Sequence, residues 1–493
     1  MNNHDITVMS GYSQESQNSR YLNGNRIVFP IKGMYEIDGM GSLGQNVNGG
    51  SSEWAFQSLF GRGTYAFKNK YLFEVNARYD GTSRIIKDNR WGFFPSASAA
   101  WRISEEHFIK DNLTWISSLK IRLSHGLLGN SNIGTYPYQD VYTASSYAFK
   151  QSLEQAIVQA GLKNKELAWE KTKVTNIGLD FNIKNSIFYG TIDVYNKYTT
   201  GILAGASMPT STGMSAPIIN YGEFKNYGIE LELGHSNKIG EFRYDLHGVM
   251  SINKNKVMKY PAPAYGTRVI EEGNPYNDYY LYEFIGLFKS QAELDAVVTP
   301  GSPRIGDIKF KDQNGDGKIT GADRVRVQGA YPKLIYSFGI DLAWRNFDLS
   351  SFFQGVAGQK YLISGWGWDP FTQNSSPNPM YLNAYDPVTN PDSNIPSIYA
   401  SGYAPMTGGT AAGSTYRLQN ASYLRLKNLQ IGYSLKPSVL QKLGISSLRV
   451  FVGGDNLLTW TPYFDGDPER AGDGTWATYP QTNTLTGGIN VKF

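Results

Sequence analysis

The sequence predicts an all-β protein, a transmembrane antiparallel β-barrel with long extracellular loops, and three observations lead to that prediction. Apolar and polar residues alternate with a period of two in one segment after another, which is typical of strands with one apolar face. These segments are about 11 to 14 residues long, and a tilted strand needs about 9–11 residues to cross a bilayer. Short and long connections alternate between them, as they do in outer-membrane barrels.

The composition removes several other classes of protein. The 493 residues include no cysteine, which excludes a disulfide-stapled fold and any thiolate metal site. A net charge of +4, from 46 basic and 42 acidic residues, is too balanced to indicate a nucleic-acid partner. No stretch approaches the roughly 20 apolar residues that a membrane helix needs. The first residues have neither a basic n-region nor an apolar segment, so no secretory signal is expected there.

Fourteen strands are predicted from the alternation. In the segment 71–80, for example, Tyr71, Phe73 and Val75 share one face, whereas Glu74 and Asn76 share the other. Short helices are expected only near 104–110 and 290–298. The predicted strands are 4–12, 54–67, 70–80, 92–103, 117–127, 173–183, 186–198, 220–234, 241–254, 334–345, 346–356, 422–435, 446–458 and 481–493.

The connections between these strands support a membrane barrel over a soluble fold. Short connections are expected at Lys68-Asn69, Lys184-Asn185, 237–240 and the Arg345/Asn346 junction. A soluble sandwich, propeller or solenoid would also show one-sided alternation, but so many long loops are unusual in a compact soluble domain. We expect 255–333 to form one long outer loop. The long connections are 13–53, 128–172, 199–219, 255–333, 357–421 and 459–480.

Several segments, taken in order along nearly the whole chain, carry a family resemblance. They are Phe60-Gly61-Arg62, Arg78-Tyr79-Asp80-Gly81-Thr82-Ser83-Arg84, Arg90-Trp91-Gly92-Phe93-Phe94-Pro95-Ser96, Trp101-Arg102-Ile103-Ser104, Trp169-Glu170-Lys171-Thr172, Asn226-Tyr227-Gly228-Ile229-Glu230, Asp312-Gln313-Asn314-Gly315-Asp316-Gly317, Asp455-Asn456-Leu457 and Asp465-Gly466-Asp467-Pro468-Glu469. The ordered set resembles the C-terminal part of a SusC/RagA-like TonB-dependent outer-membrane transporter.

The resemblance implies a fold and a function. Such transporters carry a signal peptide, a TonB box and a plug before a barrel of about 22 strands, so residues 1–493 are expected to be a C-terminal barrel fragment with about 14 of those strands. The implied function is import of an oligosaccharide or peptide through the outer membrane of a Gram-negative bacterium. Its partners would be a SusD/RagB-like surface lipoprotein, TonB and the membrane lipid. A passive fourteen-stranded porin and a soluble β-sheet glycan-binding protein remain as alternatives.

The segment 312–323 is spaced like an EF-hand calcium loop. Side-chain oxygens occupy positions 1, 3 and 5, a turn glycine occupies position 6, and a carboxylate closes the loop at position 12. We expect one calcium ion here, and the alternative is a pair of tight turns held by Asx hydrogen bonds. The candidate ligands are Asp312, Asn314, Asp316, Lys318 through its carbonyl, Thr320 and Asp323.

Aromatic residues are dense in the two last long loops. Flat rings beside Asp and Asn suit stacking on sugar rings or the core of a protein interface, and the alternative is an aromatic girdle with loop packing. Phe493 at the end of an alternating strand resembles a barrel-insertion signal, or is simply the last aromatic residue on the lipid face. The candidate substrate or partner residues are Trp366, Trp368, Phe371, Trp460, Tyr463 and Trp476.

The charged rows of the strands are expected to face a wet lumen or a plug, because Arg or Lys facing lipid at the bilayer midplane costs about 2–4 kcal/mol. These residues are Glu74, Arg78, Lys120, Arg122, Asp180, Asp193, Glu230, Glu232, Arg243, Asp245, Asp341 and Asp348. No enzyme is predicted: the five histidines have no ligand spacing, and no nucleophile motif or phosphate loop is present. A β-rich glycosidase would need a distant carboxylate pair to converge.

Overall fold

Fourteen strands of the computed structural model form one antiparallel sheet, in the order β1-β2-β3-β4-β5-β8-β9-β10-β11-β18-β19-β22-β23-β24. Their bounds are β1 His4–Arg26, β2 Gln45–Phe67, β3 Tyr71–Thr82, β4 Trp91–Arg102, β5 Ile116–Asn130, β8 Glu170–Ile183, β9 Phe188–Gly205, β10 Ile218–Ile239, β11 Phe242–Lys259, β18 Leu334–Trp344, β19 Phe347–Ala357, β22 Tyr423–Ser434, β23 Ser447–Trp460 and β24 Thr484–Lys492.

The structure describes most of the chain. The described residues are 3–29, 32–33, 35–37, 44–149, 151–159, 161–206, 208–364, 368, 370–371, 376–398, 413–436, 439–440, 445–463, 466–469, 473–474 and 481–493. They fall into two compact units. Unit 1 is Met1–Trp101, Arg122–Asn176 and Lys197–Phe224; unit 2 is Arg102–Ile121, Ile177–Asn196 and Lys225–Phe493. Across these described ranges, no helix is both long and apolar enough to span a membrane.

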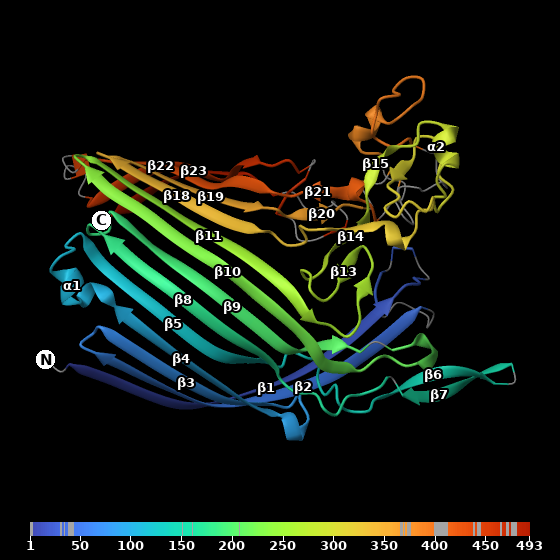
Figure 1. The fold of residues 1–493 in the computed structure, drawn as a ribbon, viewed down its shortest axis with the longest axis horizontal. Helices are drawn as coiled ribbons and strands as arrows, with labels where there is room; N and C mark the ends of the chain where they lie inside the picture. Colours follow the sequence, from blue (N-terminus) through green and yellow to red (C-terminus); the bar gives the residue numbers. More distant parts are fainter. Residues whose placement is uncertain are drawn as a thin grey trace. The chain divides into compact units, whose positions relative to one another are not determined.

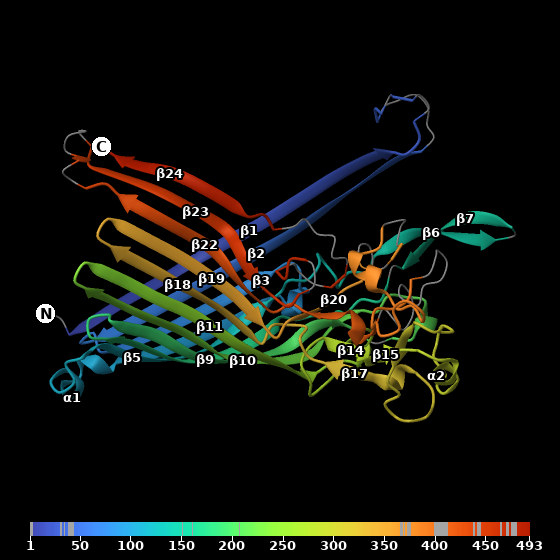
Figure 2. The same cartoon turned by 90° about the horizontal axis from the view of Figure 1, so that it is seen from above.

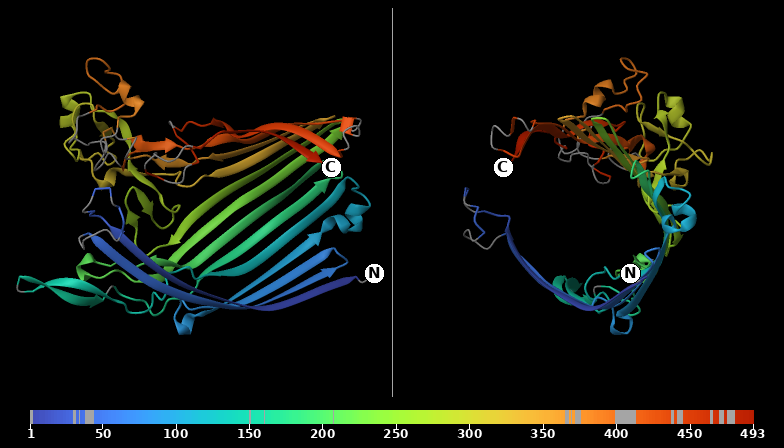
Figure 3. Two further views of the ribbon diagram at one scale, coloured as in Figure 1. Left: turned by 180° about the vertical axis from the view of Figure 1, so that it is seen from behind. Right: turned by 90° about the vertical axis from the view of Figure 1, so that its left-hand side faces the viewer.

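Unit 1 contains the long hairpin of β1 and β2. The two strands pair from His4↔Phe67 to Arg26↔Gln45 without a register shift, and Figure 3 shows them side by side along their length. A smaller hairpin, β6 (Tyr142–Phe149) with β7 (Ser152–Gln159), also belongs to this unit. Both hairpins are largely exposed along their length, so backbone pairing rather than core burial defines them.

An apolar cluster consolidates unit 1. Ile85, Phe94, Leu167 and Trp169 are buried together. The indole of Trp169 packs edge-on against Phe94 at 5.2 Å between ring centroids, and its Nε1 donates a hydrogen bond of 2.9 Å to the carbonyl of Arg90. The family-like segments around Arg90 and Trp169 are therefore explained by a contact between them.

Unit 2 contains the sheet region from β11 to β24. Figures 1 and 2 show β11, β18, β19, β22 and β23 running side by side, in agreement with their antiparallel registers. The β18–β19 turn is tight because Arg345 adopts a positive φ of 54°. Lys184 and Asn185 between β8 and β9 likewise have positive φ, at 48° and 56°.

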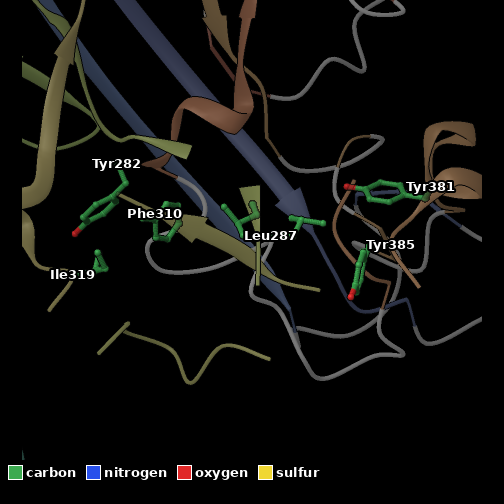
Figure 4. Close-up of a cluster of buried hydrophobic side chains, with 7 residues drawn as sticks. Tyr282, Leu287, Phe310, Ile319, Tyr381 and Tyr385 are labelled. Atoms are coloured by element: carbon green, nitrogen blue, oxygen red, sulfur yellow. The ribbon is translucent and has the colours of Figure 1, made fainter. Parts of the chain in front are cut away.

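The long connection between β11 and β18 folds into a small structured region. It holds β12 (Ala264–Tyr265), β13 (Arg268–Ile270), β14 (Asp278–Tyr282), β15 (Phe284–Leu287), α2 (Gln291–Asp295), β16 (Ile308–Phe310) and β17 (Arg324–Val327). Tyr282, Leu287, Phe310 and Ile319 are buried in a cluster that also takes Tyr381 and Tyr385 from the next loop. Figure 4 shows these side chains. Between the end of β11 at Lys259 and the start of β18 at Leu334, the chain therefore forms a folded region with its own strands and core.

The fourteen predicted strands are all confirmed, with boundary differences. The largest error lies in the expected loop 13–53, because β1 continues to Arg26 and β2 begins at Gln45. Residues 13–26 are polar and lack alternation, so the periodicity gave no signal there, whereas the backbone hydrogen bonds of a ladder need no apolar side chains. Both expected helices are shorter in the structure. The helix expected near 104–110 is a short 3₁₀ turn followed by α1 (His107–Lys110), and the helix expected near 290–298 is α2.

Apolar rows are exposed on several strands. On β3, Phe73 is 49% exposed and Val75 is 59% exposed, although both belong to the apolar row. Trp344 on β18 and Val452 on β23 are also more than half exposed. A soluble sheet would cover such rows, so this pattern favours a sheet whose apolar face meets lipid.

Candidate functional site: the loop end of the sheet

Three long connections of unit 2 are held together by hydrogen bonds in one cluster of polar groups around Asp473. Nε and Nη2 of Arg268 on β13 donate hydrogen bonds of 3.0 and 2.6 Å to Asp473 Oδ2, and Leu362 N donates one of 2.8 Å to Oδ1. The Arg268 guanidinium also lies 4.3 Å from the ring centroid of Tyr279. The cluster joins the connections after β11, β19 and β23, because each of them contributes to it.

The hydroxyl of Tyr279 completes this cluster. It lies 2.7 Å from both Asp473 Oδ1 and the carbonyl of Lys360, and it donates its proton toward these acceptors. Burial first, and then the negative charge of Asp473, raise the pKa of this hydroxyl far above its usual value. Tyr279 therefore stays protonated and remains a hydrogen-bond donor.

A second cluster, built on a buried arginine, explains the acidic segment 465–469. Arg425 on β22 is 3% exposed; its Nη2 lies 2.7 Å from Asp467 Oδ1, and its Nη1 forms an ion pair with Glu469. Lys427 and the hydroxyl of Tyr423 also bind Glu469, at 2.8 and 2.9 Å. The two carboxylates thus bring the described part of the last loop down onto β22. The sequence singled out the acidic segment but did not indicate Arg425 as its partner.

The structure separates the predicted aromatic loop residues into two groups. Trp368 and Tyr463, at 3% and 6% exposed, belong to a buried cluster with Tyr361 and Ile363. Phe371 and Trp460 are 42% and 51% exposed. The buried pair forms loop core, and only the exposed pair offers ring surface to another molecule. Trp366 and Trp476 lie outside the described residues.

The expected calcium loop is held by hydrogen bonds within itself. Asp312 accepts from the backbone N–H groups of Gly315 and Gly317, at 2.7 and 2.8 Å. The fully buried Asp323 accepts from Gln313 N and Thr320 N, at 2.9 and 2.7 Å. Burial opposes the charge of Asp323, but these backbone donors outweigh it and hold the pKa of that carboxyl below its usual range. The Asx turns weighed as the alternative are therefore present.

The candidate ligands in this loop have the right chemistry for calcium, since carboxylate, amide and carbonyl oxygens are the donors it prefers. Oδ1 and Oδ2 of Asp312 accept from Gly315 N and Gly317 N respectively, which leaves each oxygen a further lone pair for a metal ion. Oδ2 of the buried Asp323 accepts from both the backbone N–H and the hydroxyl of Thr320. Asp316 is exposed and accepts from Lys318 N at 2.9 Å through Oδ1 and from the Asn314 amide at 3.1 Å through Oδ2. Within the described ranges, the one His/Asp/Glu group close enough to share a metal ion is instead Asp245, His247 and Asp341.

Charged residues of the polar rows pair across strands. Lys120 on β5 lies 2.7 Å from Asp180 on β8. Arg449 on β23 reaches past β22 to Asp348 on β19. This reach depends on Gly432, because a Cβ there would lie 2.4 Å from the Arg449 guanidinium. Such pairing lowers the free-energy cost of placing many charged side chains on one face of the sheet. It agrees with the polar face of the sheet lining the interior of a barrel.

Comparison with known proteins identifies the family. The family model described as TonB dependent receptor-like, beta-barrel, matches residues 3–457. The chain belongs to this family of TonB-dependent receptors. It is 30% identical to TonB-dependent receptor P3 of Formosa agariphila over 99% of this chain and 51% of that protein. It is 28% identical to TonB-dependent receptor SusC of Bacteroides thetaiotaomicron over 88% of this chain and 43% of that protein.

The fold of this TonB-dependent receptor is shared with a solved structure. The RagAB peptide transporter aligns with a TM-score of 0.82 at 23% identity, covering all of this chain and 53% of that one. The resemblance drawn from the motifs is thus confirmed for the SusC/RagA-like barrel. The chain spans about half the length of the relatives it matches.

Replacing Arg425 should release the last loop. We expect Arg425→Gln to lower the free energy of unfolding by about 3–5 kcal/mol, because Asp467 is left without its buried partner. Urea unfolding in detergent, together with limited proteolysis within 461–483, measures both effects.

The matched control is Arg345→Gln, which removes an ion pair with Glu241 whose side chains are 62% and 64% exposed. That change should cost less than about 1 kcal/mol. Equal losses for the two variants would contradict the role given to Arg425.

Proposed function

We propose that this chain is the barrel portion of a TonB-dependent importer that takes up a nutrient across the outer membrane. The observation that carries the proposal is the fourteen-stranded sheet with exposed apolar rows and paired charged rows, in a chain whose family is defined by TonB-dependent receptors. Exposed apolar rows suit lipid contact, and paired charges suit an aqueous path.

The substrate class we propose is an oligosaccharide or a peptide. The peptide alternative is supported by the fold shared with RagAB, which is a peptide transporter. The oligosaccharide alternative is supported by exposed aromatic rings such as Phe371 and Trp460 at the loop end. Aromatic faces stack on sugar rings and also anchor protein interfaces. The same loops would dock a SusD/RagB-like lipoprotein, and TonB would supply the energy.

Energised uptake tests this function. In the source bacterium, deletion of the gene should abolish uptake of one labelled class, either oligosaccharides or peptides. Deletion of TonB, or addition of a protonophore, should reduce that uptake to the same level, because TonB works from the inner-membrane proton gradient.

The alternatives give different results in the same experiment. A passive porin would continue to transport its solute without TonB or a gradient, and that outcome would overturn the importer. A soluble glycan-binding protein would fractionate away from the outer membrane. Phe493, 90% exposed after β24, is proposed as the insertion signal, and its removal should lower the amount reaching that membrane.

We also propose that the loop 312–323 binds one calcium ion. In the native protein, Asp316→Ala should abolish the calcium-binding heat measured by calorimetry in detergent, since it removes one of the charged ligands. Asp295→Ala, an exposed acidic residue of α2 in the same connection, is the control and should bind as wild type does. Unaltered binding by the Asp316 variant would rule out this loop.

A further inference from the structure

A pocket of about 670 Å³ lies where β11 passes the beginning of β18, within unit 2. It contains three lysines and several tyrosines, and the function proposed above does not use it. The residues that matter here are Tyr227, Ile252, Lys254, Lys256, Tyr331 and Lys333. We refer to it as the lysine–tyrosine pocket.

The pocket adjoins the apolar rows that we place against lipid. Leu246, Met250 and Ile252 lie on one face of β11, and Leu334 stands opposite Ile252 in the register with β18. Lys254 and Lys256 continue the same row two and four residues further on, so alternation turns their side chains to the same outward face.

The height of the lysines can be estimated from strand geometry. The apolar row runs from Phe242 to Ile252, which is about 34 Å of strand at about 3.4 Å per residue. At a tilt of about 40° this row rises about 26 Å, which is close to the apolar band of about 25 Å in outer-membrane barrels. Lys254 and Lys256 therefore stand at the level where acyl chains end and head groups begin.

The positive charge of the pocket is largely uncompensated. Throughout the described ranges, no carboxylate forms an ion pair with Lys254 or Lys256, and both side chains are exposed. The one acid lining the pocket, Asp278, is 3% exposed and lies 3.7 Å from Arg326. Lys225 adds a further cation, with its Nζ 5.3 Å from the ring centroid of Tyr227.

The tyrosines suit the same level of the membrane. Tyr227 and Tyr331 are 39% and 49% exposed, and the ring of Tyr331 stacks on Tyr276 at 6.4 Å between centroids. Tyrosine is favoured at membrane interfaces because its ring is apolar and its hydroxyl is wet. Asn253 and Asn255 of the opposite row also line the pocket, but Lys254 and Lys256 belong to the row of β11 that we place against lipid, so alternation turns their ammonium groups toward the membrane side.

We propose that the lysine–tyrosine pocket binds the phosphate-bearing head group of an outer-leaflet lipid. Ammonium groups complement phosphate charge, while Ile252 and Leu334 contact the upper part of the acyl chains. The inference rests on the membrane placement in the proposed function, and it adds a lipid ligand that the transport cycle does not require.

Native mass spectrometry of the full chain in detergent tests the proposal, with bisphosphorylated lipid A as the probe. We expect Lys254→Gln/Lys256→Gln to weaken its binding about tenfold or more, since each lysine near a lipid surface contributes substantially to anionic lipid binding. Chemically dephosphorylated lipid A should bind weakly, and to wild type and variant alike.

Lys238→Gln/Lys436→Gln is the matched control, because it removes the same charge from two exposed lysines of unit 2, at the end of β10 and just after β22. It should bind bisphosphorylated lipid A as wild type does. Equal weakening of both double variants, unchanged binding by the first, or equally tight binding of dephosphorylated lipid A would overturn the proposal. Displacement of the lipid by millimolar inorganic phosphate would show a free-phosphate site and overturn it as well.

Heat-modifiable gel migration separates these outcomes from misfolding and from failure of the proposed function. A variant that retains it is folded, so its loss of lipid is specific. If the membrane placement itself were wrong, wild type would lack heat-modifiable migration and would bind none of the lipids, whereas failure of the uptake experiment alone would leave lipid A binding intact.

Discussion

The requirement that every backbone N–H and C=O find a partner within the bilayer is the constraint on which the rest of this structure depends. Lipid supplies no hydrogen bonds, so strands there must pair with neighbours along their whole length. Continuous antiparallel registers such as β18 with β19 and β2 with β3 satisfy that demand. Once the ladder is fixed, alternation assigns each side chain to one of two faces, and only an apolar face is compatible with acyl chains.

The long loops at one end of the sheet are not under this constraint, because water can pair with their backbone groups. Contacts between side chains must therefore order these loops. Two arginine clusters do this in unit 2. Arg268 and Tyr279 hold Asp473, and Arg425 holds Asp467 and Glu469. Each cluster joins segments far apart in sequence and leaves few charges unpaired. The described loops at this end of unit 2 are thus ordered by contacts between side chains.

The sequence was sufficient to locate the fourteen strands because alternation is a local property that survives in each segment separately. It failed for residues 13–26, where the strand is polar on both faces and only its partner β2 defines it. The loop clusters were also missed, since Arg268 and Asp473 are 205 residues apart and no local pattern joins them. Aromatic density indicated the right loops but could not tell that Trp368 and Tyr463 are buried while Trp460 is exposed.

The most direct test of the central claim uses the absence of cysteine from the chain. Single cysteines placed in turn at residues 72–79 of β3 can carry a nitroxide spin label, and collisions with oxygen and with a water-soluble nickel complex are measured in bilayers. We predict opposite period-two oscillations, with oxygen highest at 73, 75 and 79 and nickel highest at 74, 76 and 78. Oscillations in phase, or nickel access to the apolar row, would contradict the account.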